Sequence, residues 1–264
     1  MPDHPRTSSH PASHPLPRRA ALSTLLALAS ATVLTMPAHA QGDPQQRILV
    51  FGDSQAQGLA GGVQRYYRGD KEHRVLDRSK ISTGLVPRSN YDWPVQARGI
   101  ASAEHADIAF ALFGANDRPP VRIGGRMDPG LVQRFSDTYG ARVAEIAGCF
   151  KQNRVPLVWV GHPIVRDAAF NEDMALLNDI FSTRVAEAGA PFLSTWDAFK
   201  GPDGAFAIYG RGVDGQTTRL RADDGVHMTP AGYDMITAML LPFIEKLRRQ
   251  PPLLPTAARL PIQG

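Results

Sequence analysis

A serine at a sharp turn after an apolar segment is the residue of this sequence best placed to do chemistry. The apolar residues 48–51 lead directly into Gly52, Asp53 and Ser54. A serine hydroxyl is a weak nucleophile at neutral pH unless a base takes its proton and hydrogen-bond donors stabilise the oxyanion that forms. Ser54 is therefore a candidate nucleophile if the chain supplies those groups. The alternative is a serine that only caps a helix.

An aspartate and a histidine three residues apart could supply the acid and the base. Asp224 precedes His227 at a spacing that lets the carboxylate orient the imidazole and stabilise the imidazolium, while the other ring nitrogen takes the serine proton. Asp223 is the second choice because it lies one residue further from the histidine. The alternative is an Asp/His pair that only satisfies backbone groups of a loop.

Two residues are candidate oxyanion donors in addition to the backbone N–H of Ser54, which lies where a helix dipole favours an anion. Asn116 follows the predicted strand 107–113, and its side-chain amide can donate a hydrogen bond. Gly84 follows the second predicted strand, and its backbone N–H is not obstructed by a side chain. Asparagine and glycine are also ordinary turn residues.

Three further residues are candidates for substrate contacts. His162 follows a predicted strand and is the rival base, but no carboxylate lies at a useful local spacing, so we expect it to line the pocket. Trp93 could form a platform for an acyl group or a sugar, or pack in the core. Arg118 could bind an anionic group of the substrate or pair with Asp117, and the ion pair is favoured.

Short apolar runs alternate with longer amphipathic stretches, which is typical of an α/β fold. We predict strands at about residues 47–51, 74–77, 107–113, 155–160 and 191–194, and helices at about 56–68, 93–104, 131–153, 172–188 and 230–248. Parallel strands need crossover connections, and these supply helical layers on both faces of the sheet. The candidate residues fall beyond the strand ends or just before the last helix, where ligands bind in such sheets.

Two stretches show no helical or strand period. Residues 119–130 are rich in proline, glycine and arginine, which predicts a loop at the rim of the active site. Residues 251–264 are predicted to form an irregular C-terminal tail. Residues 41–250 have the length of one large α/β domain.

Residues 1–40 are predicted to form a secretory signal peptide. Arg18 and Arg19 precede a stretch rich in alanine and leucine, and Ala38 and Ala40 provide small residues at the cleavage positions. The apolar stretch is shorter than the roughly 20 residues that span a bilayer, and an uncleaved anchor is the alternative. Cleavage would leave a periplasmic or secreted protein with no stable membrane anchor.

Composition excludes several other classes. The net charge is only +4, which gives no indication of a nucleic-acid partner. Cys149 is the single cysteine, so neither an internal disulfide nor a cysteine–histidine metal spacing can form. The aspartates near the motifs lack the histidine-rich spacing of a metal phosphoesterase. We expect no metal and no cofactor.

Taken together, Ser54, Gly84, Asn116 and His227 resemble the SGNH, or GDSL-type, hydrolase superfamily, whose motif blocks contribute Ser, Gly, Asn and His in that chain order. The resemblance covers about residues 47–245. Its second block is the loosest, and Ser82 or Thr83 could take the role given to Gly84. Gln55 stands where the superfamily often has leucine, which removes no catalytic group. Further agreement over residues 80–85 and 91–94 is similar to a bacterial, exported subfamily of largely unassigned function.

The resemblance implies a flavodoxin-like three-layer α/β/α sandwich with a parallel sheet of about five strands and metal-free acyl chemistry. It implies catalysis by Ser54, His227 and Asp224, with the backbone N–H groups of Ser54 and Gly84 and the Asn116 amide as the oxyanion hole. We expect an exported serine esterase that acts on O-acyl, including O-acetyl, groups of envelope or extracellular carbohydrate. The alternatives are a sugar O-acyltransferase, a lipid esterase or thioesterase, and a non-catalytic carbohydrate-binding accessory protein.

Overall fold

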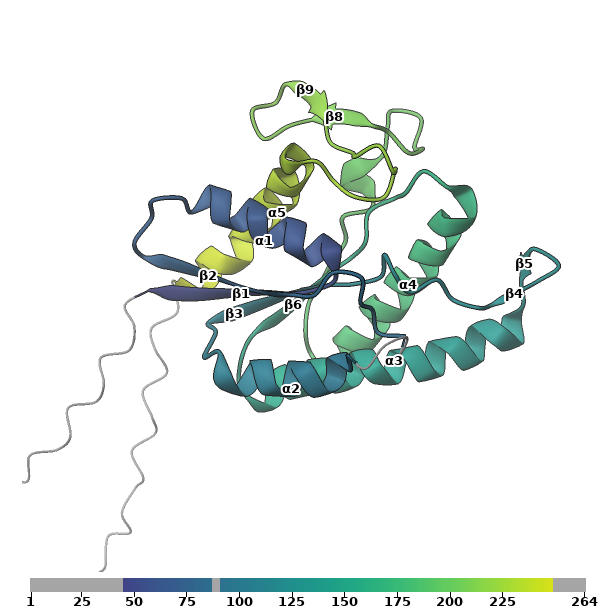
Figure 1. Cartoon of the computed structure of the whole chain (residues 1–264), viewed down its shortest axis with the longest axis horizontal. Coiled ribbons are helices and arrows are strands. Elements are labelled where there is room, and N and C mark those ends of the chain that lie inside the picture. Colours follow the sequence, from purple (N-terminus) through teal and green to yellow (C-terminus); the bar gives the residue numbers. More distant parts are fainter. Residues whose placement is uncertain (1–44, 87–90, 249–264) are drawn as a thin grey trace, which may run out of the picture. The chain divides into compact units, whose positions relative to one another are not determined.

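The computed structural model describes residues 45–86 and 91–248, which form a five-stranded parallel sheet with helices around it (Figure 1). The strands of the sheet are β1 (Gln46–Gly52), β2 (His73–Ser79), β3 (Ile108–Leu112), β6 (Leu157–Val160) and β7 (Phe192–Leu193). They pair in the order β2-β1-β3-β6-β7, and each pairing is parallel. This is the order of flavodoxin-like sheets. The predicted signal peptide and C-terminal tail lie outside the described residues.

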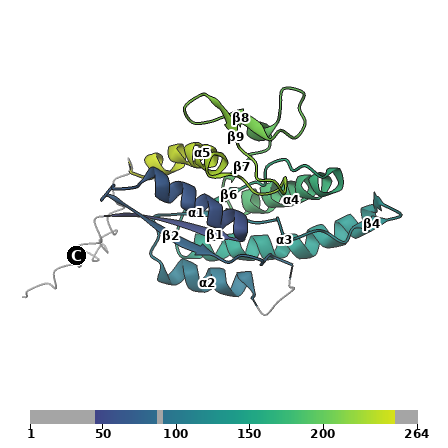
Figure 2. The same ribbon diagram turned by 45° about the horizontal axis from the view of Figure 1, so that its top comes forward.

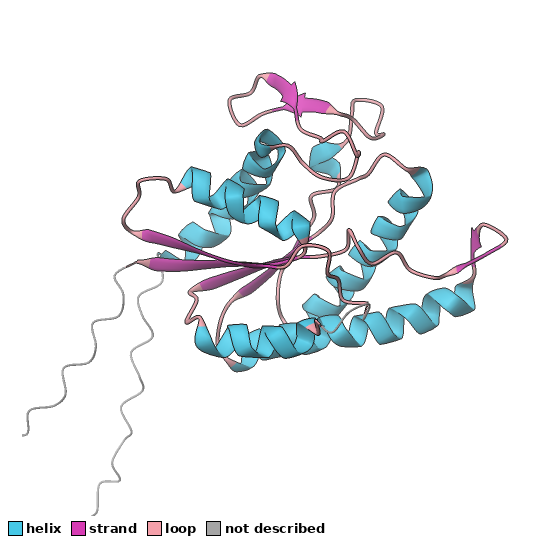
Figure 3. Ribbon diagram, viewed as in Figure 1, coloured by secondary structure: helices cyan, strands magenta, loops and turns pink. Residues whose placement is uncertain are grey.

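Helices cover both faces of the sheet. They are α1 (Ser54–Tyr66), α2 (Trp93–Ala103), α3 (Pro129–Gln152), α4 (Ala168–Glu187) and α5 (Pro230–Arg248). Ile48 and Val50 of β1 belong to the cluster with α1 and α5, whereas Leu49 and Phe51 belong to the cluster with α2, α3 and α4. Successive side chains of a strand point to opposite faces, so the clusters form two separate cores. Figures 2 and 3 show these layers, and the predicted α/β/α sandwich is confirmed.

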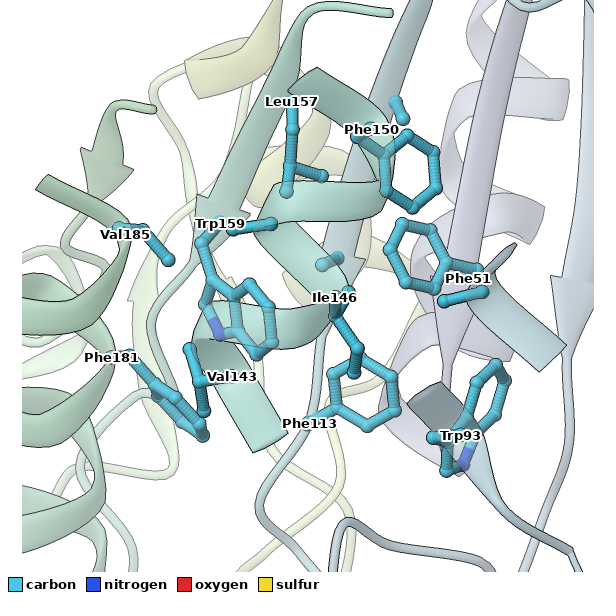
Figure 4. Close-up of a cluster of buried hydrophobic side chains, with 14 of the residues drawn as sticks. Phe51, Trp93, Phe113, Val143, Ile146, Phe150, Leu157, Trp159, Phe181 and Val185 are labelled. Carbon is cyan, nitrogen blue, oxygen red and sulfur yellow. The ribbon is translucent and has the colours of Figure 1, made fainter. Parts of the chain in front are cut away.

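Aromatic side chains fill the core between the sheet and α2, α3 and α4 (Figure 4). Phe51 stacks on Phe150 with ring centroids 4.8 Å apart, and Trp93 meets Phe113 edge-on at 4.9 Å. The Trp93 side chain is completely buried, and its indole Nε1 donates to Thr83 Oγ1 at 2.9 Å. The hypothesis that Trp93 offers a platform to substrate is therefore wrong. Its ring packs in the core and its N–H supports the 80–86 loop.

The segment 119–130 is more regular than predicted. It contains a short hairpin, β4 (Arg122–Ile123) and β5 (Arg126–Met127). Gly124 and Gly125 form its turn with positive φ angles of 59° and 80°, which residues with a side chain rarely adopt. Helix α3 then begins at Pro129, because the Asp128 carboxylate caps it by accepting from Leu131 N at 2.9 Å.

A second hairpin and a short 3₁₀ helix follow β7 in the chain and were not predicted. They are η1 (Asp197–Phe199), β8 (Tyr209–Arg211) and β9 (Thr217–Arg219). Each is only three residues long, too short to show a period in the sequence. The β8-β9 hairpin leads into the loop that carries the predicted base, and Figure 1 shows it on the side of α1 and α5. No helix in the described part of the chain is both long and apolar enough to cross a bilayer.

Candidate active site

Ser54 lies where the inner strand β1 turns into α1, and its neighbour Asp53 caps the helix. One Asp53 carboxylate oxygen accepts from Gln55 N at 2.8 Å, and the other accepts from Gly114 N at 3.2 Å. The same side chain thus links the ends of the adjacent strands β1 and β3. Because Asp53 is the N-cap, the Ser54 hydroxyl is not occupied in capping. The alternative that Ser54 is only a helix cap is therefore wrong.

Asp53 is fully buried, and its environment changes its protonation. Burial raises the pKa of its carboxyl from 3.8 to about 7, against the hydrogen bonds that Gln55, Gly114 and Ala115 donate to it. The nearby carboxylate of Asp117 adds to the rise. Desolvation disfavours the charged form of a carboxyl more than these backbone donors favour it.

The Ser54, His227 and Asp224 side chains form a hydrogen-bonded relay. Ser54 Oγ lies 2.8 Å from His227 Nε2, and His227 Nδ1 lies 2.6 Å from Asp224 Oδ2. The remaining carboxylate oxygen, Asp224 Oδ1, accepts from Val226 N at 2.8 Å and from His227 N at 2.9 Å. These contacts fix the carboxylate to the loop that carries the imidazole. A relay of this geometry can take the serine proton during attack.

Asp224, rather than Asp223, orients the imidazole. Partial burial acts to raise the pKa of Asp224, but hydrogen bonds from Val226 and His227 outweigh it and hold the pKa below its usual value. Asp224 is therefore charged at neutral pH, as the orienting acid must be. The Asp223 side chain is almost fully exposed and pairs with Arg219.

Asn116 and Gly84 lie together beyond the strands that precede them. Asn116 Nδ2 donates to the backbone oxygen of Thr83 at 2.8 Å, which leaves the second amide hydrogen for an oxyanion. Gly84 cannot be replaced without a shift, because a Cβ there would lie 2.1 Å from Asp117 Oδ1. Both residues line a cavity of about 280 Å³, with Ser82, Thr83, Val86, Ala115, Asp117 and Arg118. The structure thus brings Gly84 and Asn116, two of the three predicted oxyanion donors, to one cavity.

Asp117 has a structural role in this site beyond the predicted pairing with Arg118. Its buried carboxylate accepts from Leu85 N at 2.8 Å, Val86 N at 2.9 Å and the Tyr139 hydroxyl at 2.9 Å. These bonds hold the backbone that follows Gly84 against the end of β3. Its place directly after Asn116 was the available signal, but an Asp in a turn has many uses.

His162 is completely buried and does not take part in the relay. His162 Nδ1 contacts the Pro163 backbone oxygen at 2.9 Å, and Nε2 has no hydrogen-bond partner among the described residues. Burial lowers the pKa of His162 from 6.5 to about 4, so the ring is neutral at physiological pH. The expectation that it lines the pocket is therefore wrong, because none of its surface is exposed.

Arg118 forms an ion pair with Asp173, a partner that was not predicted, and its predicted pairing with Asp117 stays a prediction. Its Nε donates to the buried carboxylate of Asp173 in α4, and its guanidinium lies over the Phe170 ring, 4.4 Å from the centroid. Arg122 of β4 donates to the same Asp173 carboxylate. This ion-pair cluster ties the hairpin to α4. The Arg118 side chain is 44% exposed and still lines the cavity beside Asn116, so contact with substrate stays a prediction.

Other candidate sites of the described chain are less suited to this chemistry. A larger cavity of about 470 Å³ lies at the amino ends of β3 and β6, where Ile108 and Leu157 are among its lining residues. None of the predicted site residues lines it. Within residues 45–86 and 91–248, no group of three or more His, Cys, Asp or Glu side chains is arranged to hold a metal ion.

The fold is that of the SGNH, or GDSL-type, hydrolases, and residues of the types in that class's motifs, Ser54, Gly84, Asn116 and His227, lie beyond the carboxyl ends of its strands or just before α5. Residues 47–242 match one protein family over most of the described chain. The protein belongs to this family, which is described as "Protein of unknown function (DUF459)". No match is found among curated proteins.

Solved structures share the fold at low sequence identity. One is a carbohydrate acetylesterase family member from Sinorhizobium meliloti, with a TM-score of 0.52, 14% identity, and coverage of 77% of this chain and 99% of that one. A member of the lipolytic protein G-D-S-L family from Veillonella parvula DSM 2008 has the same TM-score, identity and coverage. A protein named TesA follows with a TM-score of 0.51, 15% identity, and coverage of 76% and 99%.

Proposed function

We propose that the protein is an exported serine esterase that hydrolyses O-acyl groups, with O-acetyl groups of envelope or extracellular carbohydrate as its substrates. The reaction class is inferred from the relay, in which Ser54 Oγ lies 2.8 Å from His227 Nε2 and His227 Nδ1 lies 2.6 Å from Asp224 Oδ2. A protein that only binds carbohydrate needs neither a hydrogen-bonded serine nor an oxyanion hole.

The relay supports a two-step reaction through an acyl-enzyme. Ser54 Oγ attacks the ester carbonyl while His227 Nε2 takes its proton, and Asp224 stabilises the imidazolium. The oxyanion of the tetrahedral intermediate is bound by the backbone N–H groups of Ser54 and Gly84 and by Asn116. Its collapse breaks the ester bond, and His227 returns the proton to the departing alcohol. Water then attacks the acyl-enzyme with His227 again as base, which releases the acid and restores Ser54.

The polar lining of the cavity beside Gly84 and Asn116 supports a hydrophilic substrate. The side chains of Ser82, Thr83, Asn116 and Arg118 all border it and can form hydrogen bonds with hydroxyl or carbonyl groups. The fold is shared with a member of a carbohydrate acetylesterase family. These polar groups suit the hydroxyl-rich part of a carbohydrate ester, whereas a long acyl chain would need an apolar groove.

The test of the substrate is release of acetate from acetylated polysaccharide or peptidoglycan, with Ser54→Ala as the control. We expect the wild-type protein to release acetate and the control to release none. Acetyl transfer to an added oligosaccharide in excess of acetate release would make the protein a transferase. If the protein hydrolyses lysophospholipid or an acyl thioester but releases no acetate from polysaccharide, the proposed carbohydrate substrate is wrong.

Export has a test of its own. The mature protein recovered from the native cell envelope should begin at Gln41, because Ala38 and Ala40 occupy the small-residue positions that signal peptidase recognises. Membrane-bound protein that still begins at Met1 would support an uncleaved anchor instead.

A further inference from the structure

Gln55, the residue after the candidate nucleophile, uses both ends of its side-chain amide to join separate parts of the site. It is buried in α1 with 1% of its surface exposed. Its Nε2 donates to the backbone oxygen of Val226 at 3.1 Å, and its Oε1 accepts from the Tyr233 hydroxyl in α5 at 2.9 Å. Val226 directly precedes His227 in residues 224–227, which we name the base loop. The amide therefore connects the Ser54 helix, the base loop and α5.

Tyr233 can reach this position only because α1 has a glycine opposite it. A Cβ at Gly58 would lie 2.0 Å from the Tyr233 ring, so any larger residue would collide with the ring. Burial raises the pKa of Tyr233, and the hydroxyl therefore stays protonated and donates to Gln55. This donation orients the amide, since only its oxygen can accept from Tyr233. Its nitrogen is then directed to Val226.

Arg221 donates a hydrogen bond to the same backbone oxygen. Its side chain is fully buried, with Nη1 donating to Val226 O at 3.2 Å and Nη2 donating to the Ile164 backbone oxygen. Burial lowers the pKa of Arg221 to about 10, which still leaves the guanidinium charged at neutral pH. The Val226 carbonyl thus accepts from two buried side chains.

We propose that Gln55 is a positioning residue that fixes the base loop relative to Ser54. The base loop has no helical or strand structure to define where its imidazole lies. Val226 is one residue from His227, so a shift of the Val226 carbonyl moves the imidazole and lengthens the 2.8 Å contact between Ser54 Oγ and His227 Nε2. Small displacements of this kind greatly reduce catalysis. The inference rests on the proposed function.

The test compares Gln55→Met, which keeps an unbranched side chain of similar length but has no amide, with Thr237→Val. The Thr237 hydroxyl is buried between α1 and α5 and bonds the Tyr233 backbone oxygen at 2.9 Å, without touching Gln55 or the base loop. The two variants therefore disturb the same helix pair but differ at the base loop. For each protein we would measure the rate of labelling by a fluorophosphonate, kcat and KM on p-nitrophenyl acetate, and the melting temperature.

We expect Gln55→Met to lower the labelling rate and kcat about tenfold, with KM within about twofold, because misplacement of the base affects the reaction and not ground-state binding. Thr237→Val should lower only the melting temperature. Tyr233→Phe should cause a smaller fall in kcat and add nothing in the Gln55→Met background, because both side chains act through one amide.

Two results would overturn the inference, and they differ in meaning. If Gln55→Met is labelled as fast as wild type and has the same kcat, Gln55 does not position the base loop. The same conclusion follows if its labelling rate and kcat fall no further than those of Thr237→Val. Absence of labelling in the wild-type protein would refute the proposed function and this inference with it.

Discussion

Three consecutive residues at the start of α1 have separate tasks. Ser54 carries the proposed nucleophilic oxygen, Asp53 caps the helix and accepts from Gly114 just beyond β3, and Gln55 bonds the base loop. Only the serine needs to be reached by substrate, and the other two side chains are buried. The turn thus combines an accessible hydroxyl with rigid support on both sides.

The assignment of the base is tested by replacing each histidine with alanine. His227→Ala should lower kcat on p-nitrophenyl acetate by about 10³ or more, because only this imidazole contacts both Ser54 and a carboxylate. His162→Ala should lower the melting temperature, because it leaves a cavity, but should retain most of kcat. An equal or greater loss of kcat in His162→Ala would refute the proposed relay.

The role of Asn116 is tested by Asn116→Ala. We expect kcat on p-nitrophenyl acetate to fall by about 10²–10³ with little change in KM, because the amide stabilises charge that develops only in the transition state. The melting temperature should fall slightly, since one bond to the Thr83 backbone oxygen is lost. A fall in kcat below about threefold would remove Asn116 from the oxyanion hole.

The chemistry-bearing residues could be predicted from sequence, but the residues that hold them could not. Ser54, Asn116, Asp224 and His227 belong to short motifs whose types and order indicate a reaction. Asp117 acts on the 80–86 loop through bonds to residues more than 30 positions away in the chain. His162 shows the opposite case, since its place after β6 predicted a pocket residue but burial decided otherwise.

At the scale of elements, the small residues of α1 allow its close contact with α5. A Cβ at Gly58 would meet the Tyr233 ring, and one at Gly62 would lie 2.6 Å from Thr237 Oγ1. A salt bridge between Arg65 and Asp234, 2.7 Å long, joins the same helices nearer the surface. This packing holds the helix that begins with Ser54 next to the helix that follows the base loop.

The packing is tested by comparing glycine-to-alanine changes in two helices. Gly58→Ala should lower the free energy of unfolding by about 1–3 kcal/mol, because the new methyl group meets the Tyr233 ring. Gly99→Ala in α2 should raise it by up to about 1 kcal/mol, because nothing lies within 4 Å and alanine favours a helix. Urea denaturation measures both. A Gly58→Ala protein as stable as Gly99→Ala would contradict this account of the α1–α5 contact.

The long elements could be predicted because hydrophobic periodicity is visible over many residues. All five strands of the sheet and the helices α1 to α5 lie close to their predicted ranges. The start of α3 at Pro129 was placed too late, because the cap formed by Asp128 is a single side-chain contact. The hairpins β4-β5 and β8-β9 were missed because two or three residues per strand give no period.

At the scale of the whole molecule, two buried titratable groups give opposite pH dependence to stability. The pKa of Asp53 rises from 3.8 to about 7 on folding, so the native state binds more protons and stability falls as pH rises through this range. The pKa of His162 falls from 6.5 to about 4, so the unfolded state binds more protons and stability falls as pH drops through that range. Between about pH 4 and 6.5 the two contributions partly cancel.

Substitutions separate these contributions in urea denaturation measured across the same pH range. The free energy of unfolding of wild type minus that of Asp53→Asn should decrease from about pH 4 to about 7. The corresponding difference for His162→Leu should increase from about pH 4 to 6.5. If neither difference in the free energy of unfolding changes with pH, burial does not shift the pKa of Asp53 or of His162 as described.

The central claim is that Ser54 becomes acylated during turnover, and this can be observed directly. We would mix the protein with p-nitrophenyl acetate, quench in acid during steady state, and locate any added acetyl group by intact mass and peptide mapping. We predict one acetyl group on Ser54 in the wild-type protein and none in Ser54→Ala or His227→Ala. Ester turnover that persists in Ser54→Ala, or an acetyl group carried by another residue during turnover, would contradict the account.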